Sequence, residues 1–277
     1  MAFKDHFSRQ SDAYSRYRPG YPAALVDWVA NLPAGRRLAL DCATGNGQAA
    51  VALAPHYRNV LALDGSLTQL GRAAAHPRVA YVAALAERLP VADHRVDLVV
   101  AAQAAHWFDF GRFNAECARV LAPGGAVAAW TYEKFRVDAA VDAVVDAFYR
   151  DVVGPYWPPE RRYVEQGYRT LPFPWDEIPA PEFELETDWD LAQVLGYLGS
   201  WIGGIEAGSF WRAAFDVVGQ RDVNLAAFRV HRNPLRAIHF GCAGQIGGLA
   251  TADAHVALVV ETVGCGQRAV GVLFAVA

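Results

Sequence analysis

The stretch from residue 37 to residue 130 alternates short apolar runs with helix-like segments, and this alternation is the strongest constraint on the fold. Its first unit is the apolar run 38–43, a turn containing Gly45 and Gly47, and the helix-like segment QAAVALA. Further strand-like runs occupy residues 60–64, 79–84, 96–103 and 126–130. Because runs that are apolar on both faces indicate strands covered by helices on each side, the sequence predicts an α/β fold with a doubly wound, mostly parallel sheet.

Composition and charge indicate a globular chain and argue against several kinds of partner. Apolar residues make up 53% of the 277 residues and charged residues 19%, so the chain has the apolar side chains for a sizeable core. The net charge of −4 offers no broad basic surface for nucleic-acid phosphates. No apolar stretch reaches the roughly 18 residues of a membrane span. We therefore expect neither a nucleic acid nor a membrane as partner.

The four cysteines are scattered without CxxC spacing, at Cys42, Cys117, Cys242 and Cys265. This pattern argues against a structural zinc site and against a disulfide framework. We therefore predict no metal site and a reducing, cytoplasmic location.

The sequence predicts one main domain over residues 1–232 and a tail over residues 233–277. Within the domain, residues of about 150–210 are dense in proline and aromatic side chains and predict a lid insertion before the last strands of the sheet. The strand-like run 223–230 follows this insertion and is expected to be one of those last strands. In the tail, two apolar runs flank a GCGQ turn like a hairpin. Such a hairpin packs on the domain, joins a dimer or reflects a shifted reading frame, so a monomer and a homodimer both remain open.

The glycine turn after the first strand is the predicted cofactor site. Open α/β sheets bind ligands at the carboxyl ends of their strands, and Asp64 closes the next strand about 20 residues on, where a carboxylate accepts from ribose hydroxyls. The segment GNGQAA also satisfies the GxGxxA dinucleotide fingerprint, so an NAD-dependent oxidoreductase remains a candidate. Asp41 places a negative group at the turn, which suits a sulfonium better than a pyrophosphate. This favours S-adenosylmethionine as cofactor.

Four motifs in order resemble those of class I S-adenosylmethionine-dependent methyltransferases with a methyltransferase type 11 domain. DCATGNG resembles their E/D-x-G-x-G-x-G motif, with Ala43 in place of the first glycine. LALD ending in Asp64 resembles the acidic second motif, AERLP the adenine-side segment, and RVLAPGGAVAAW the L-x-P-G-G turn and fifth strand. The resemblance implies a Rossmann-like sheet of seven strands.

Two further segments resemble the subgroup of trans-aconitate methyltransferase-like proteins: FSRQSDAYSRYRPGYP at residues 7–22 and AAQAAHWFD at residues 101–109. The resemblance implies that the opening segment folds over the cofactor, that the glycine turn holds its methionine part and that Asp64 holds its ribose. The implied cofactor-binding residues are Tyr14, Arg18, Asp41, Ala43, Thr44, Gly45, Gly47, Gln48, Asp64, Gly65, Ala86, Glu87 and Gln103.

The methyl acceptor is expected to be a small molecule, with O-methylation of a carboxylic acid as one possibility. His106 is placed to take a proton from the acceptor or to donate a hydrogen bond to it, and a packing role is equally compatible. A carboxylate acceptor would need no general base, since methyl transfer requires an in-line nucleophile. The implied substrate residues are His106, Trp107, Arg162, Tyr168 and Trp201.

Two observations keep another class of function open. Ala43 replaces a motif glycine, and GSWI stands where the subgroup has an RTWS-like sequence, which removes a positive contact and leaves a tricarboxylate substrate in doubt. Together with the unmatched tail, these departures leave a non-catalytic S-adenosylmethionine-binding or assembly protein as the alternative to an enzyme.

Overall fold

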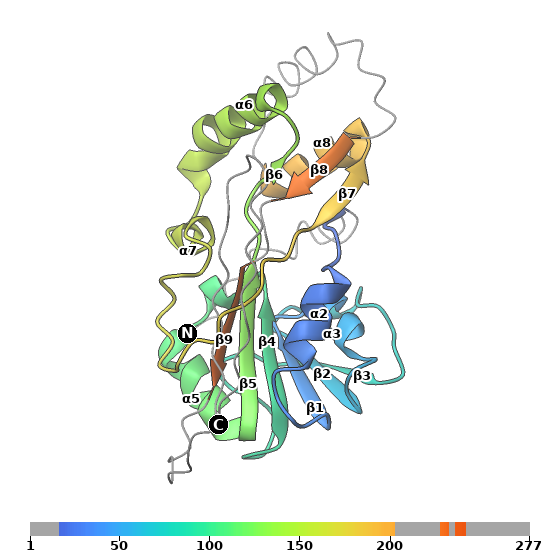
Figure 1. Cartoon of the computed structure of the whole chain (residues 1–277), viewed down its shortest axis with the longest axis vertical. Helices are drawn as coiled ribbons and strands as arrows, with labels where there is room; N and C mark the ends of the chain where they lie inside the picture. The colour runs from blue at the N-terminus through green and yellow to red at the C-terminus, as the bar shows by residue number, and fades with distance from the viewer. Residues whose placement is uncertain (1–16, 203–227, 233–235, 242–277) are drawn as a thin grey trace, which may run out of the picture.

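The computed structural model describes residues 17–202, 228–232 and 236–241, which form a large sheet with a smaller sheet beyond one end of it (Figure 1). Five strands of the large sheet are parallel, and the sixth pairs antiparallel with β5. Their order is β3-β2-β1-β4-β5-β9. The strands are β1 (Leu38–Cys42), β2 (Asn59–Asp64), β3 (Val79–Ala83), β4 (Val96–Ala102), β5 (Leu121–Thr131) and β9 (Arg236–Gly241).

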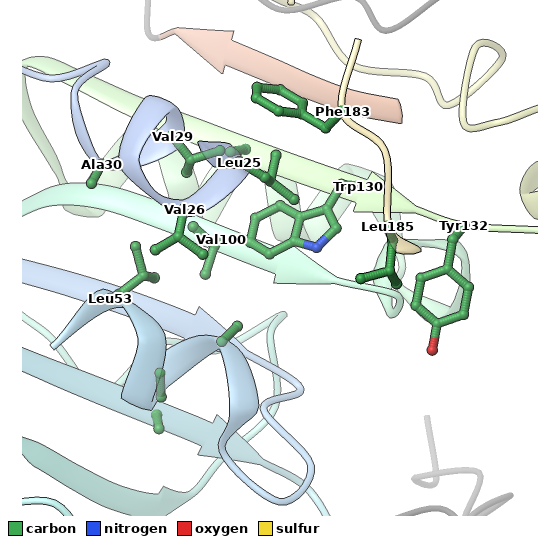
Figure 2. Packing of buried hydrophobic residues seen from close by; sticks show 14 of the residues in the cluster. Leu25, Val26, Val29, Ala30, Leu53, Val100, Trp130, Tyr132, Phe183 and Leu185 are labelled. Carbon is green, nitrogen blue, oxygen red and sulfur yellow. The ribbon is translucent and has the colours of Figure 1, made fainter. Parts of the chain in front are cut away.

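Helices cover both faces of the large sheet, as the doubly wound prediction requires. On one face, α2 (Ala23–Ala30) and α3 (Gln48–Leu53) pack on alternate strand residues such as Val100 and Trp130 (Figure 2). On the other face, α5 (Phe110–Val120) packs on the remaining set, including Val99. The residues of the central strands β1 and β4 and of most of β5 are buried on both sides, which explains their nearly continuous apolar sequence.

The chain after β5 builds a second, antiparallel sheet and an aromatic cluster. The second sheet has the order β6-β8-β7, and its strands are β6 (Phe135–Arg136), β7 (Glu186–Trp189) and β8 (Phe228–Arg232). The connecting elements are α6 (Ala139–Ala147), the π-helix η3 (Phe148–Val153), the 3-10 helix η4 (Gly154–Tyr156), α7 (Arg161–Glu165) and α8 (Leu191–Ile202). In the cluster, the rings of Phe148, Tyr149, Trp157 and Tyr197 lie 5.4–6.4 Å from the ring of Trp201 or from one another.

Two expectations about the last strands differ from the structure. The run 223–230 was expected among the final strands of the main sheet, but its described part belongs to β8, which pairs with β6 and β7. Conversely, β9 falls in the range 233–277 and pairs with β5 over six residues, so these residues belong to the sheet. An apolar pattern predicts that a strand forms and does not select its partner, because pairing depends on residues distant in sequence.

Other local differences are small. The helix-like segment between the second and third apolar runs forms only the four-residue α4 (Leu67–Leu70). The Pro123–Gly125 turn lies within β5 as an irregularity, because the register against β4 shifts between Val96 and Leu98. The seventh strand is not found among the described residues, and the apolar hairpin of the tail and residues 7–16 of the opening segment lie outside them. Among the described helices, none has the length and apolar character needed to cross a membrane.

Asp97, the second residue of β4, connects that strand to the residues at the start of β1. Its carboxylate is buried, with 4% exposure of the residue, and Oδ2 accepts from the backbone N–H groups of Arg37 and Leu38 at 2.7 and 3.0 Å. A buried carboxylate that satisfies two backbone donors fixes where β1 begins beside β4.

Asp97→Ala is expected to lower the free energy of unfolding by about 2–3 kcal/mol, because both backbone donors lose a charged acceptor. Urea denaturation measures the loss. The matched control is Asp93→Ala, since the Asp93 side chain is 64% exposed and its ion pair with the Arg119 side chain is a surface contact worth about 0–1 kcal/mol. Equal losses in the two variants would contradict the structural role of Asp97.

Candidate functional site

A pocket of about 590 Å³ lies where the carboxyl ends of the parallel strands meet. Residues at or just beyond the end of each of the five strands line it, from Asp41 near the end of β1 to Tyr132 after β5. Parallel strands present all their carboxyl ends at one edge, so the topology itself gathers these side chains. Arg18 and Tyr21 close one side, and Pro159, Glu160, Arg162 and Tyr163 contribute from the segment around α7.

The turn after β1 is built from left-handed residues. Ala43 has φ 56, Gly45 has φ 58 and Gly47, the N-cap of α3, has φ 86. Gly45 lines the pocket and donates its N–H to Oδ2 of Asp64 at 2.9 Å. Gly47 does not line the pocket, and a Cβ there would lie 2.2 Å from the Tyr81 hydroxyl. Gly45 therefore shapes the pocket wall, whereas Gly47 permits close packing beneath it.

Asp41 is a buried carboxyl group in the pocket wall, with 1% exposure. Its Oδ2 accepts from the Thr44 hydroxyl at 2.5 Å, and its Oδ1 has no hydrogen-bond partner in the described part of the chain. Burial raises the pKa of Asp41 to about 7, against the lowering effect of the Thr44 hydrogen bond. A cationic group in the pocket would satisfy this carboxyl.

Asp64 sits at the end of β2, where its two oxygens accept from the backbone N–H groups of Gly45 and Ser66 at 2.9 and 2.8 Å. An ionised carboxylate has about four acceptor sites, so one such group can accept from several donors at once. Gly65 lines the same part of the pocket. Ala86 and Glu87 follow β3, and Glu87 Oε1 accepts the Asp109 N–H at 2.9 Å, which joins this wall to the loop after β4.

Gln103 ends β4 in a left-handed conformation, with φ 58, and lines the pocket. Its amide is fixed by β5: Oε1 accepts from the Thr131 hydroxyl at 3.0 Å, and Nε2 donates to the Tyr132 carbonyl at 3.3 Å. Nearby, Gln48 donates to the Arg18 carbonyl at 3.2 Å, and the Arg18 guanidinium lies 4.7 Å from the Tyr197 ring centroid. Strained residues of this kind gather at functional sites.

His106 and Trp107 lie on the 3-10 helix η2 (Ala105–Trp107), directly after β4, and both line the pocket. His106 is buried, and its Nδ1 lies 2.6 Å from the Tyr168 hydroxyl. Burial, and to a lesser extent the positive charge of Arg161, lowers the pKa of His106 to about 3. The imidazole is therefore neutral at physiological pH.

The remaining predicted residues are placed differently. Arg162 lines the pocket and donates to the Tyr163 hydroxyl at 3.1 Å. Tyr168 does not line the pocket, but its hydroxyl lies 2.6 Å from Nδ1 of His106, which does. Trp201 is buried in the aromatic cluster, away from the pocket lining, because its helix packs on η3 through this ring. Tyr14 lies outside the described residues.

Sequence reasoning did not single out several pocket residues: Tyr21, Ser66, Gln69, Leu85, Phe108, Asp109, Phe110, Arg112 and Tyr132. A positional signal existed for some of them, since Tyr132 follows β5 and Asp109 caps the helix after β4. Tyr21 lies within the opening segment, residues 7–22, and its ring packs edge-on against the Trp130 ring with a centroid distance of 5.3 Å. No cluster of three or more potential metal ligands occurs within the described ranges.

Comparisons with known proteins give one consistent result. The model of a family described as a methyltransferase domain matches residues 40–129. A solved structure named as a type II methyltransferase, from Anaeromyxobacter dehalogenans, is 42% identical, with a TM-score of 0.70 and coverage of 80% of this chain and 96% of that one. A Dictyostelium discoideum protein named as a methyltransferase is 31% identical over 225 residues, which are 80% of this chain and 82% of its own. A malonyl-[acyl-carrier protein] O-methyltransferase of a Marinomonas species is 35% identical over 130 residues, 44% of this chain and 48% of that protein.

The conformation of Ala43 generates a stability prediction. A left-handed residue with a Cβ costs roughly 1 kcal/mol relative to glycine, so Ala43→Gly is expected to raise the free energy of unfolding by about 0.5–1 kcal/mol. Thermal and urea denaturation measure the gain. The control is Ala143→Gly in the middle of α6, where the same change costs about 1 kcal/mol because the backbone is helical. Destabilisation by both changes would contradict the left-handed conformation at Ala43.

Proposed function

Because the chain belongs to the methyltransferase domain family and is an S-adenosylmethionine-dependent methyltransferase, we propose that its acceptor is a small carboxylic acid methylated on oxygen. The observation that carries this proposal is the pairing, in one pocket, of a carboxyl end with a cationic and hydrogen-bonding end. The carboxyl end holds Asp41, Asp64 and Glu87, whereas the other wall holds His106, Trp107 and Arg162.

The carboxyl end fits the proposed cofactor. S-adenosylmethionine supplies an electrophilic methyl group on a positively charged sulfur when it is bound. The orphaned Oδ1 of Asp41 offers a negative partner for that positive charge, and the Asp64 carboxylate, which lines the pocket at the end of β2, suits the ribose hydroxyls. In this proposal the methionine part is surrounded or supported by Arg18, Ala43, Thr44, Gly45, Gly47 and Gln48. The ribose lies beside Gly65, the adenine beside Ala86 and Glu87, and the methyl group beside Gln103.

The other wall suits an anion. Arginine pairs with carboxylates through two parallel hydrogen bonds, and Arg162 is exposed at the pocket while held against Tyr163. The relative named as a malonyl-[acyl-carrier protein] O-methyltransferase takes a malonyl group, which bears a carboxylate, and this supports the same acceptor chemistry here. Trp107 and His106 complete this wall with side chains that donate hydrogen bonds.

Several finer assignments belong to the same proposal. The pocket-lining residues of the RPGYP and HWF segments support placement in the trans-aconitate methyltransferase-like subgroup. Residues of about 150–210 would act as a lid, since Glu160, Arg162 and Tyr163 line the pocket. We further propose a cytoplasmic monomer or homodimer whose tail, apart from β9, lies outside the catalytic domain.

Calorimetric titration with S-adenosylmethionine, S-adenosylhomocysteine and NAD tests the cofactor assignment. We expect saturable binding of the first two and none of NAD, and we expect Asp64→Ala to weaken binding at least about tenfold, because two ribose hydrogen bonds are lost. Asp93→Ala, outside the pocket, should bind as the parent does. Binding of NAD alone would overturn the proposal in favour of an oxidoreductase. Binding of both adenosyl ligands without turnover of any carboxylic acid would favour the non-catalytic alternative.

Asp41 predicts a pH dependence of cofactor affinity. Because burial raises the pKa of Asp41 to about 7, this carboxyl holds a proton in the folded, ligand-free protein below that pH. A cationic ligand favours the ionised form, so binding releases the proton and affinity rises with pH, by up to about tenfold per unit until about pH 7. Calorimetry in buffers of different ionisation enthalpy measures the proton released.

Asp41→Asn is the matched variant, since it keeps an oxygen acceptor for the Thr44 hydroxyl and cannot ionise. Its affinity is expected to be lower at pH 7.5 and to vary less with pH, and any slope that remains reports titration of the ligand. Identical pH profiles in the parent and the variant would show that Asp41 does not face the positive charge.

A further inference from the structure

The pair formed by His106 and Tyr168 joins the pocket wall to a residue outside the pocket. The His106 ring lines the pocket, whereas Tyr168 is 1% exposed and lies behind it. The ring centroids are 5.7 Å apart, and Trp107 holds the imidazole from another side at 4.6 Å. His106 is therefore fixed in orientation by two aromatic neighbours and one hydrogen bond.

The length of that hydrogen bond indicates which group donates. The Tyr168 hydroxyl and His106 Nδ1 are 2.6 Å apart. Hydrogen bonds donated by O–H groups have typical lengths of about 2.5–3.0 Å, whereas those donated by N–H groups lie at about 2.7–3.2 Å. The distance thus favours a hydroxyl that donates to an unprotonated Nδ1. A neutral imidazole with an unprotonated Nδ1 carries its single proton on Nε2.

Tyr168 keeps this position in a strained backbone. Its φ is 63, a conformation that is uncommon for a bulky residue, and its N–H donates to the Tyr163 carbonyl at 2.7 Å just after α7. Strain of this kind persists where the surrounding structure enforces it, often at functional sites. The turn after α7 thus directs a phenol at one ring nitrogen of a pocket histidine.

We propose that Tyr168 is a positioning residue that locks His106 in the Nε2–H tautomer, so that His106 donates a hydrogen bond to the methyl acceptor and does not take a proton from it. Within the described residues His106 makes no other hydrogen bond, which leaves Nε2 for the pocket occupant. Burial also lowers the pKa of His106, which opposes protonation by any acceptor.

This assignment deepens the proposed function, on which its statement about the acceptor rests. A donor at Nε2 selects acceptors that have no proton to lose, of which a carboxylate is the simplest. A lone pair of the carboxylate oxygen forms the new O–C bond while the S–C bond breaks and its electron pair stays on sulfur. No proton moves in this step, so no general base is required.

Nitrogen-15 NMR of histidine-labelled protein reads the tautomer without any turnover. We expect His106 to show a protonated Nε2 and an unprotonated Nδ1, unchanged across about pH 5–8. His106→Gln identifies the signal, and Tyr168→Phe should yield a mixture of tautomers. The charged groups to consider around the imidazole are Arg161 of α7 and, among the other residues that line the pocket, Asp41, Asp64, Glu87, Asp109, Arg112, Glu160, Arg162 and Arg18. A protonated Nδ1, or an imidazolium that forms within this range, would overturn the proposal.

Kinetics provide the second readout. Tyr168→Phe is expected to lower kcat/KM for the acceptor about tenfold, with the dissociation constant of S-adenosylmethionine unchanged. Tyr57→Phe is the matched control, because it removes another buried tyrosine hydroxyl, bonded to the Ala30 carbonyl at 3.1 Å and outside the pocket lining. His106→Gln, which retains an N–H donor near the position of Nε2, should keep more activity than His106→Leu.

The two proposals fail separately. If NMR shows the Nε2–H tautomer but no carboxylic acid is methylated, the acceptor assignment is wrong and the positioning role of Tyr168 stands. If carboxylic acids are methylated but the spectrum shows a protonated Nδ1, the positioning role is wrong and the proposed function stands.

Discussion

The parallel alignment of β1 to β5 is the constraint on which the rest of the structure depends. Parallel pairing sends every carboxyl end to the same edge of the sheet, so turns that are distant in sequence become neighbours there. Asp41, Asp64, Glu87 and Gln103 lie at or just beyond the carboxyl ends of four of these strands. None of them needs a special local sequence to reach the others, because the strand register already places them.

Around that edge, the pocket combines unfavourable local states that the scaffold enforces. Ala43 and Gln103 are left-handed without being glycine, and Asp41 is buried with one oxygen unsatisfied. Each feature costs folding free energy, and the buried strands and helices on both faces supply the stability that tolerates it. A bound cation offsets part of this cost at Asp41, so ligand binding and local stability are coupled at the turn after β1.

The sequence predicted what local patterns determine. Five strands, the glycine turn and the helix that follows it are predicted by apolar periodicity and turn chemistry, and β1 to β5 and α3 agree with those predictions. The sequence did not predict the partner of β8, the inclusion of β9 in the main sheet or the burial of Trp201. These depend on contacts between residues far apart in the chain, where an aromatic side chain serves a pocket or a core equally well.

Tyr168 shows how such long-range information changes a chemical interpretation. From its residue type alone it was a direct contact for an anionic substrate, and His106 was as suitable for proton transfer as for donation. In the structure, the phenol occupies Nδ1 of the imidazole, and the two side chains are 62 positions apart in sequence. A histidine with one nitrogen occupied has fewer possible roles than a free one, so the partner outside the pocket limits what the residue inside it does. The chemistry offered to the methyl acceptor therefore depends on a residue behind the pocket wall, and a sequence motif made of adjacent residues does not include such a residue.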